Sequence, residues 1–142
     1  MTYRIVVGVD GSAHSLAALR WALKEAKARP GGEVAALLAW QVPFLSFPGA
    51  FDKDELEKRA KEFLIETVSE VVPTPAVPLH TVVAEGDPTE SLVKASQEAD
   101  LLVLGIRGRS PFAGLLLGSV SQGAAATAAC PVVLVKVTDE KE

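Results

Sequence analysis

The chain has 142 residues, a formal net charge of −4 at pH 7 and one cysteine. One cysteine excludes an intrachain disulfide and a cysteine-built metal site, and the acidic balance disfavours nonspecific binding to nucleic acid or to an anionic membrane, since both need a basic face. The first apolar run, residues 5–9, is far shorter than the roughly 20 residues of a membrane span, and no signal-peptide cleavage site follows it. We therefore expect residues 1–142 to form one cytoplasmic domain with a normal core.

Apolar runs of strand length alternate with segments of helical periodicity, the pattern of an α/β domain in which helices cover both faces of a parallel sheet. Prolines at positions 73, 75 and 78 indicate that the third strand lies at an edge of the sheet, where a missing N–H costs no ladder hydrogen bond. Asp87 and Pro88 are typical of a helix N-cap and first helical position. The expected strands are residues 4–9, 34–40, 79–84, 101–105 and 132–137, and the expected helices are residues 13–28, 53–71, 88–98 and 119–129.

A glycine-rich turn joins the fourth strand to the last helix. Glycines allow the backbone to approach a ligand closely or to take a positive φ, arginines supply charge, and hydroxyls would lie beside the free amides of the helix. These features favour a phosphate; the alternative is an ordinary turn with solvated arginines and a serine that caps its own helix. The residues concerned are Gly105, Arg107, Gly108, Arg109, Gly118, Ser119 and Ser121.

Asp10 ends the first strand, which lies beside the fourth strand if the sheet order reverses there. Its carboxylate could accept hydrogen bonds from ribose hydroxyls or help to hold Mg²⁺ beside phosphates; the alternative is that it caps the helix that starts near Ala13. Trp40 ends the second strand and suits a base pocket or the core. His14 and His80 have no neighbours in sequence that would make a metal or catalytic set.

Four segments occur in the order found in a known family. They read IVVGVDGS at residues 5–12, VAEGDPTESL at 83–92, ADLLVLGIRGRSPFAGLLLGSVSQ at 99–122 and CPVVLV at 130–135. In these four segments and their order, the chain resembles the universal stress protein family over essentially its whole length. The glycine spacing of the turn resembles that of the family's ATP-binding branch. The resemblance implies a parallel sheet of order 3-2-1-4-5 and a homodimer in which the strand from Val132 to Val137 pairs antiparallel with its twin.

The resemblance also implies a role in nucleotide binding for particular residues. Asp10 would contact the ribose, the Trp40 backbone the adenine edge, and Gly86 would lie near the base. The phosphates would meet the amides of Gly108, Ser119 and Val120 and the hydroxyls of Ser119 and Ser121. The full set of expected contacts is Val9, Asp10, Ser12, Trp40, Gly86, Gly105, Arg107, Gly108, Arg109, Gly118, Ser119, Val120 and Ser121.

Two residues depart from the family pattern. Ile106 stands where a small or polar residue is common, so the phosphate turn could sit differently. Gly123 lies inside the last helix, where glycine costs about 1 kcal/mol relative to alanine, which indicates a marginal helix or one pressed close to the sheet.

The resemblance favours an ATP-binding module whose occupancy regulates or signals under stress, with AMP or cyclic AMP as alternative ligands and Mg²⁺ as a possible companion. A slow ATPase or phosphoryl-transfer enzyme is the first alternative, although no general base accompanies Asp10 in sequence. A protein-interaction module that binds no nucleotide is the second.

Overall fold

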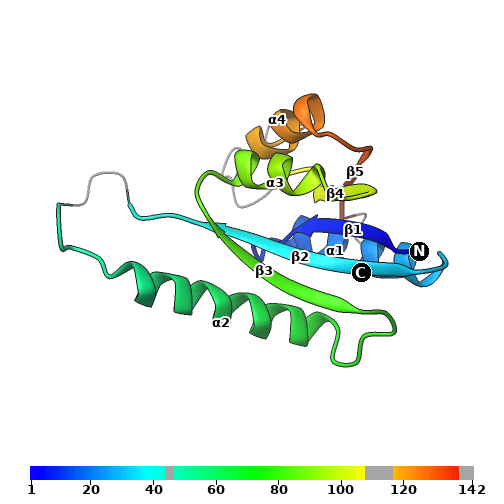
Figure 1. Ribbon diagram of the computed structural model, residues 1–142, viewed down its shortest axis with the longest axis horizontal. Helices are drawn as coiled ribbons and strands as arrows, with labels where there is room; N and C mark the ends of the chain where they lie inside the picture. Colours follow the sequence, from blue (N-terminus) through cyan, green and yellow to red (C-terminus); the bar gives the residue numbers. More distant parts are fainter. Residues whose placement is uncertain (44–46, 108–116, 138–142) are drawn as a thin grey trace.

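The computed structural model describes residues 1–43, 47–107 and 117–137. Its five strands form one sheet of order β3-β2-β1-β4-β5 in which every neighbouring pair is parallel (Figure 1). This topology confirms the predicted order, with β3 at an edge. The elements are β1 (Tyr3–Gly8), α1 (Ala13–Lys27), β2 (Gly32–Trp40), α2 (Lys53–Val71), β3 (Leu79–Glu85), α3 (Pro88–Ser96), β4 (Leu101–Gly105), α4 (Ser119–Thr127) and β5 (Val132–Val135).

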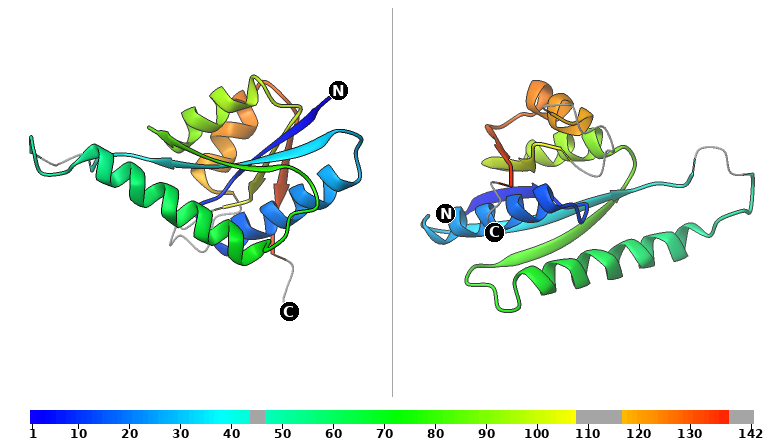
Figure 2. Two further views of the ribbon diagram at one scale, coloured as in Figure 1. Left: turned by 60° about the horizontal axis from the view of Figure 1, so that its bottom comes forward. Right: turned by 180° about the vertical axis from the view of Figure 1, so that it is seen from behind.

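Helices cover both faces of the sheet, with α1 and α2 on one side and α3 and α4 on the other (Figure 2). Successive side chains of a strand point to opposite faces, so Ile5 and Val7 pack against α1 while Val6 packs on the side of α3 and α4. All three are at most 2% exposed. Burial on both faces explains why the central strands are apolar without alternation.

Two elements near the C-terminus are shorter than predicted. α4 ends at Thr127 because the amide of Ala129 donates to Oγ of Ser96, at 2.9 Å, instead of continuing the helix. β5 ends at Val135, opposite the last residue of β4, and the amide of Val137 donates to Nδ1 of His14 at 3.0 Å. In both cases an amide that the sequence pattern assigned to a helix or a strand instead donates to a side chain from a distant part of the chain.

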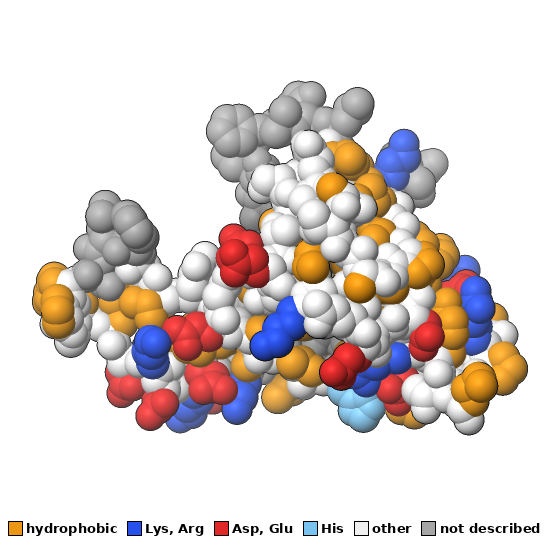
Figure 3. Space-filling model, turned by 45° about the horizontal axis from the view of Figure 1, so that its top comes forward, with side chains coloured by type: hydrophobic (Ala, Val, Ile, Leu, Met, Phe, Trp, Pro, Cys, Tyr) orange, Lys and Arg blue, Asp and Glu red, His pale blue; other side chains and the backbone are white. Residues whose placement is uncertain are grey.

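Charged side chains of both signs are interspersed on the face shown in Figure 3. On α2, Arg59 pairs with Glu55 and Lys61 with Glu57, each four residues apart. Exposed pairs of this kind stabilise a helix by only about 0.3–0.5 kcal/mol each, so they serve chiefly to keep the outer side of α2 polar. Among the described helices, none is both long enough and apolar enough to cross a lipid bilayer.

Two glycines mark close packing between elements rather than freedom of the backbone. Of the two reasons that the sequence offered for Gly105, a positive φ or a close approach, the structure shows a close approach: φ is not positive, and a Cβ there would lie 2.7 Å from the carbonyl carbon of His14. Gly123 faces α3, where a Cβ would lie 2.9 Å from Cγ2 of Thr89, so at this glycine the helix is pressed against its neighbouring helix. The end of β4 and the start of α1 therefore approach so closely that only glycine fits.

We expect Gly105→Ala to lower the free energy of unfolding by about 1–3 kcal/mol, the usual cost of overpacking. The new methyl group would meet backbone atoms of His14, which cannot rotate away. Denaturant titration followed by circular dichroism measures the change. Adding His14→Ala should not restore stability, because the carbonyl carbon and Cβ remain; a full rescue, or an unchanged midpoint in the single variant, would contradict this packing.

Candidate functional site

A cavity of about 210 Å³ opens at the carboxyl ends of β1, β2 and β4. It lies where the sheet order reverses, since β1 pairs with β2 on one side and β4 on the other. In open parallel sheets this switch point is where ligands bind. The wall residues are Gly8, Val9, Asp10, Ser15, Leu37, Leu38, Ala39, Pro88, Leu92, Leu104, Gly105, Arg107, Gly118, Ser119, Val120 and Ser121.

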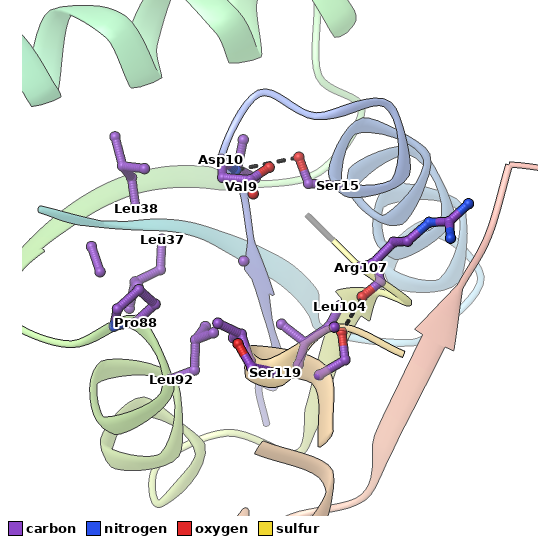
Figure 4. Close-up of a pocket in the computed structure, with 16 residues that line it drawn as sticks. Val9, Asp10, Ser15, Leu37, Leu38, Pro88, Leu92, Leu104, Arg107 and Ser119 are labelled. Atoms are coloured by element: carbon purple, nitrogen blue, oxygen red, sulfur yellow. Dashed lines mark hydrogen bonds between the residues drawn. The ribbon is translucent and has the colours of Figure 1, made fainter. Parts of the chain in front are cut away.

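The cavity has an apolar end and a polar end (Figure 4). Leu37 of β2 lies near Pro88 and Leu92 of α3 at the apolar end, while Leu38 points to the opposite side of β2. Asp10, Ser15, Arg107 and Ser119 come from the exits of β1 and β4 and from the first turns of α1 and α4. A ligand that fits this wall combines a flat or apolar part with a hydrogen-bonding, anionic part.

The N-terminus of α4 differs from those of the other helices. Side chains cap α1, α2 and α3, through Ser12, Asp52 and Asp87. Within the described residues, α4 begins at Gly118 without a side-chain cap, so Ser119 does not cap its own helix. The first-turn amides of α4, which have no intrahelical partner, therefore face the cavity together with the positive end of the helix dipole.

Backbone hydrogen bonds hold the two ends of the turn before α4, Ile106 and Gly118, in place. The amide of Gly118 donates to the carbonyl of Ile106 at 2.8 Å, and the amide of Ile106 donates to the carbonyl of Val135 at 2.8 Å. Ile106 thus joins the start of α4 to β5 through its backbone. The departure from the family pattern at Ile106 leaves this backbone link in place.

The turn after β1 fixes Asp10 at the cavity wall. Oδ1 of Asp10 accepts the amide of Ser12 at 2.9 Å, and Oγ of Ser12 accepts the amide of Ser15 at 3.3 Å. Ser12 is therefore the N-cap of α1, and the alternative that Asp10 caps this helix is wrong. The sequence left this alternative open because Asp10 and Ser12 are both good capping residues and lie two positions apart.

Ser121 has a structural hydrogen bond of its own. Its side chain is 3% exposed, and Oγ donates to the carbonyl of Gly105 at 2.7 Å. The hydroxyl proton is used to join α4 to β4, so this group does not offer a proton to a phosphate. Ser119, by contrast, is exposed at the first position of α4 and lies on the cavity wall.

Several expected contacts lie away from the wall, and several wall residues were not expected. Ser12, Trp40 and Gly86 do not line the cavity, although the amide of Gly86 donates to the carbonyl of Trp40 at 2.8 Å. Gly108 and Arg109 lie outside the described residues. The wall residues that sequence reasoning missed are mostly apolar: Gly8, Ser15, Leu37, Leu38, Ala39, Pro88, Leu92 and Leu104. For some of them the available signal was position, because Gly8, Ala39 and Leu104 lie at or beside the carboxyl ends of strands and Ser15 and Pro88 lie in the first turns of helices. Leu37, Leu38 and Leu92 lie inside their elements and carried no such signal.

The described residues contain no group of three or more histidine, cysteine, aspartate or glutamate side chains that could hold a metal ion. A Mg²⁺ ion at this cavity would consequently depend on Asp10 and on oxygens that the ligand brings.

His14 links the polar end of the cavity to the segment after β5. Its Nδ1 accepts the amide of Val137 at 3.0 Å. Burial and, to a smaller extent, the charge of Arg107 lower the pKa of His14 below its ordinary value of 6.5. The neutral ring is therefore favoured, and only a neutral ring leaves a nitrogen lone pair for Val137.

Fold and site together define a doubly wound α/β domain with a cavity at its switch point. A model of the universal stress protein family matches residues 1–136. The chain belongs to the universal stress protein family. A universal stress protein of Mycobacterium tuberculosis is 37% identical over 134 residues, which cover 93% of this chain and 44% of that protein. The chain thus spans less than half the length of this relative.

Two solved structures of similar proteins were determined with nucleotides. A universal stress protein in complex with cAMP is 30% identical, with a TM-score of 0.67, covering 95% of this chain and 97% of that one. The universal stress protein of Archaeoglobus fulgidus in complex with dAMP is 28% identical, with a TM-score of 0.67, covering 94% and 98%. Both ligands are adenine nucleotides.

We expect His14 to make stability depend on pH. Because its pKa is lowered in the folded state, the unfolded chain binds the proton first as the pH falls. Its contribution is fully present above the unfolded pKa of about 6.5 and is lost as the pH falls through the folded pKa. His14→Asn keeps an acceptor near Nδ1 but does not titrate. The variant should show a smaller fall in unfolding free energy between about pH 7 and about pH 5; equal slopes would contradict this role.

Proposed function

We propose that this protein binds an adenine nucleotide, ATP, in the cavity at the switch point, and that occupancy of this site regulates its behaviour in the cytoplasm. The observation that carries the proposal is the first turn of α4, which lacks a side-chain cap in the described structure and faces a cavity with one apolar end. An anion at that position would act as the cap, because the amides and the helix dipole both favour negative charge.

The chemistry of the wall suits the three parts of a nucleotide. The apolar end, with Leu37 and Leu92, offers a dry surface to a base. Asp10 can accept hydrogen bonds from ribose hydroxyls, as carboxylates do in other doubly wound sheets. The amides of Ser119 and Val120, with Arg107 nearby, offer donors to phosphates. The ribose and phosphate roles agree with the ones that the family resemblance implies, whereas the surface offered to the base differs, since Trp40 and Gly86 do not line the cavity.

The complexes of similar proteins with cAMP and dAMP support an adenine nucleotide as the ligand. The choice of ATP rests on the glycine spacing of the turn and on the donors at its two ends. A regulatory role is supported by the contact between His14 and Val137, since Arg107 on the cavity wall acts on His14 through its charge. A change in charge beside Arg107 would alter the electrostatic potential at His14 and thereby its hydrogen bond with Val137, in the segment after β5.

The direct test is to identify and titrate the ligand. Small molecules released by denaturing the purified protein are identified by mass spectrometry, and ATP, AMP and cyclic AMP are titrated by calorimetry. We expect an adenine nucleotide in the released material and tightest binding of ATP. If no nucleotide is released and none binds at millimolar concentration, the proposed function is wrong.

Two variants of Gly118 test the position of the phosphates in the same titration. Gly118→Asp places a carboxylate cap on α4, which competes with a phosphate for the same amides, so ATP should bind at least about tenfold more weakly, or about 1.4 kcal/mol. Gly118→Asn is the matched control, since it has the same shape without the charge and should weaken binding less. Affinities equal to the wild type in both variants would mean that the phosphates lie elsewhere.

We further propose that β5 pairs antiparallel with β5 of a second copy. The carbonyls of Pro131 and Val135 accept the amides of Leu102 and Ile106, so in a parallel ladder the alternate residues Val132 and Leu134 direct their amides to the open edge. An apolar edge strand with unpaired amides favours pairing with another chain. The structure's β5 is two residues shorter than the strand to Val137 that the sequence predicted.

We expect Leu134→Pro to shift the protein from dimer to monomer, because proline removes an amide that faces the open edge and does not bond β4. Leu134→Ala is the matched control, since it also loses the side chain but keeps the amide and should remain a dimer. Sedimentation velocity measures both. A wild-type monomer, or a proline variant that remains a dimer, would contradict pairing through β5.

A further inference from the structure

Ser15 is a buried polar residue on the cavity wall, in the first turn of α1. Its side chain is 4% exposed. Oγ accepts the amide of Asp10 at 3.2 Å and donates to the carbonyl of Ser12 at 3.0 Å, and Figure 4 shows the first of these bonds. The hydroxyl thus connects the helix to the residue that ends the turn after β1.

The helix itself does not require this hydroxyl. Oγ of Ser12 already caps α1, and the carbonyl of Ser12 already accepts the first helical amide, that of Leu16, at 3.0 Å. The bond from Ser15 to Ser12 is additional, and the bond from the Asp10 amide lies outside the helix. What the Ser15 hydroxyl adds is a fixed position for the backbone of Asp10.

Asp10 is consequently held at two points. Ser15 binds its amide, and the amide of Ser12 binds Oδ1 of its carboxylate. Between them Gly11 has a φ of 88°, a conformation that other residues rarely adopt. A binding group is effective when its neighbours fix it to within about half an ångström, and these two bonds restrain the backbone and one carboxylate oxygen of Asp10.

We propose that Ser15 is a positioning residue for the ligand site, and that its hydroxyl places the Asp10 carboxylate to accept hydrogen bonds from the ribose hydroxyls of the bound nucleotide. This inference rests on the proposed function and deepens it, since it adds the residue that determines how the ribose is recognised. Ser15 does not itself need to touch the ligand.

The experiment compares ATP with 2′,3′-dideoxy-ATP in calorimetric titrations of full-length variants. The ratio of the two dissociation constants measures recognition of the ribose hydroxyls, and it should be about tenfold or more in the wild type, the value of one hydrogen bond to a charged group. Asp10→Asn, which keeps the acceptor for Ser12, should lower the ratio. Ser15→Ala should lower it as well, and the double variant should lower it no further, because the two residues act as one unit.

Ser96→Ala is the matched control for loss of a buried serine. Ser96 is 1% exposed, donates to the carbonyl of Val93 and accepts the amide of Ala129, so it makes the same two kinds of bond away from the cavity. Both alanine variants should lose thermal stability, but only Ser15→Ala should lose ribose recognition. Amide hydrogen exchange at Asp10 should also accelerate in Ser15→Ala and not in Ser96→Ala.

The outcomes separate the two proposals. A wild type that binds neither compound overturns the proposed function, and this inference with it. A wild type that distinguishes the compounds, with a Ser15→Ala variant that distinguishes them equally well, overturns the inference alone. Equal loss of the ratio in Ser15→Ala and Ser96→Ala would also overturn it, because the effect would then be a general loss of stability.

Discussion

The position of β1 between β2 and β4 is the constraint on which the rest of the structure depends. The helix that follows β1 covers one face of the sheet and the helix that follows β4 covers the other, so the chain leaves the carboxyl ends of these two paired strands toward opposite faces and an opening remains between the two connections. Asp10 enters this opening from β1 and Arg107 from β4. Residues almost a hundred positions apart thereby become two sides of one site.

Close packing around that opening decides which groups remain available to a ligand. Gly105 allows β4 to approach α1, and its carbonyl accepts a hydrogen bond from Oγ of Ser121. Gly118 is bound to Ile106 through its backbone, which brings the uncapped start of α4 to the cavity. The hydrogen bonds of Ser121 and Gly118 thus go to backbone carbonyls of the wall itself. The exposed Ser119 and the first amides of α4 face the cavity. Binding geometry here is a consequence of how the loops are anchored.

Most of the fold could be predicted from the sequence because its signals are local. Apolar runs without alternation indicated buried parallel strands, and the prolines before β3 indicated an edge. The ends of α4 and β5 could not be predicted, since Ser96 and His14 capture the amides of Ala129 and Val137 from distant parts of the chain. Part of the site was predictable for the same reason as the fold, since Asp10 follows closely on the carboxyl end of a strand. The apolar wall was not, because Leu37 and Leu92 look like ordinary core residues in sequence.

By itself, the sequence determined the alternation of strands and helices, the family, and the glycine turn that ends at Gly118, because these depend on periodicity and on residues close together in the chain. Only the tertiary structure decided that α4 starts without a side-chain cap within the described residues and that Ser12 and not Asp10 caps α1. It also decided that the hydroxyls of Ser121 and Ser15 make hydrogen bonds to backbone groups. The physical reason is that each polar group makes only a few hydrogen bonds, and its partners are the atoms that folding brings to within about 3 Å of it.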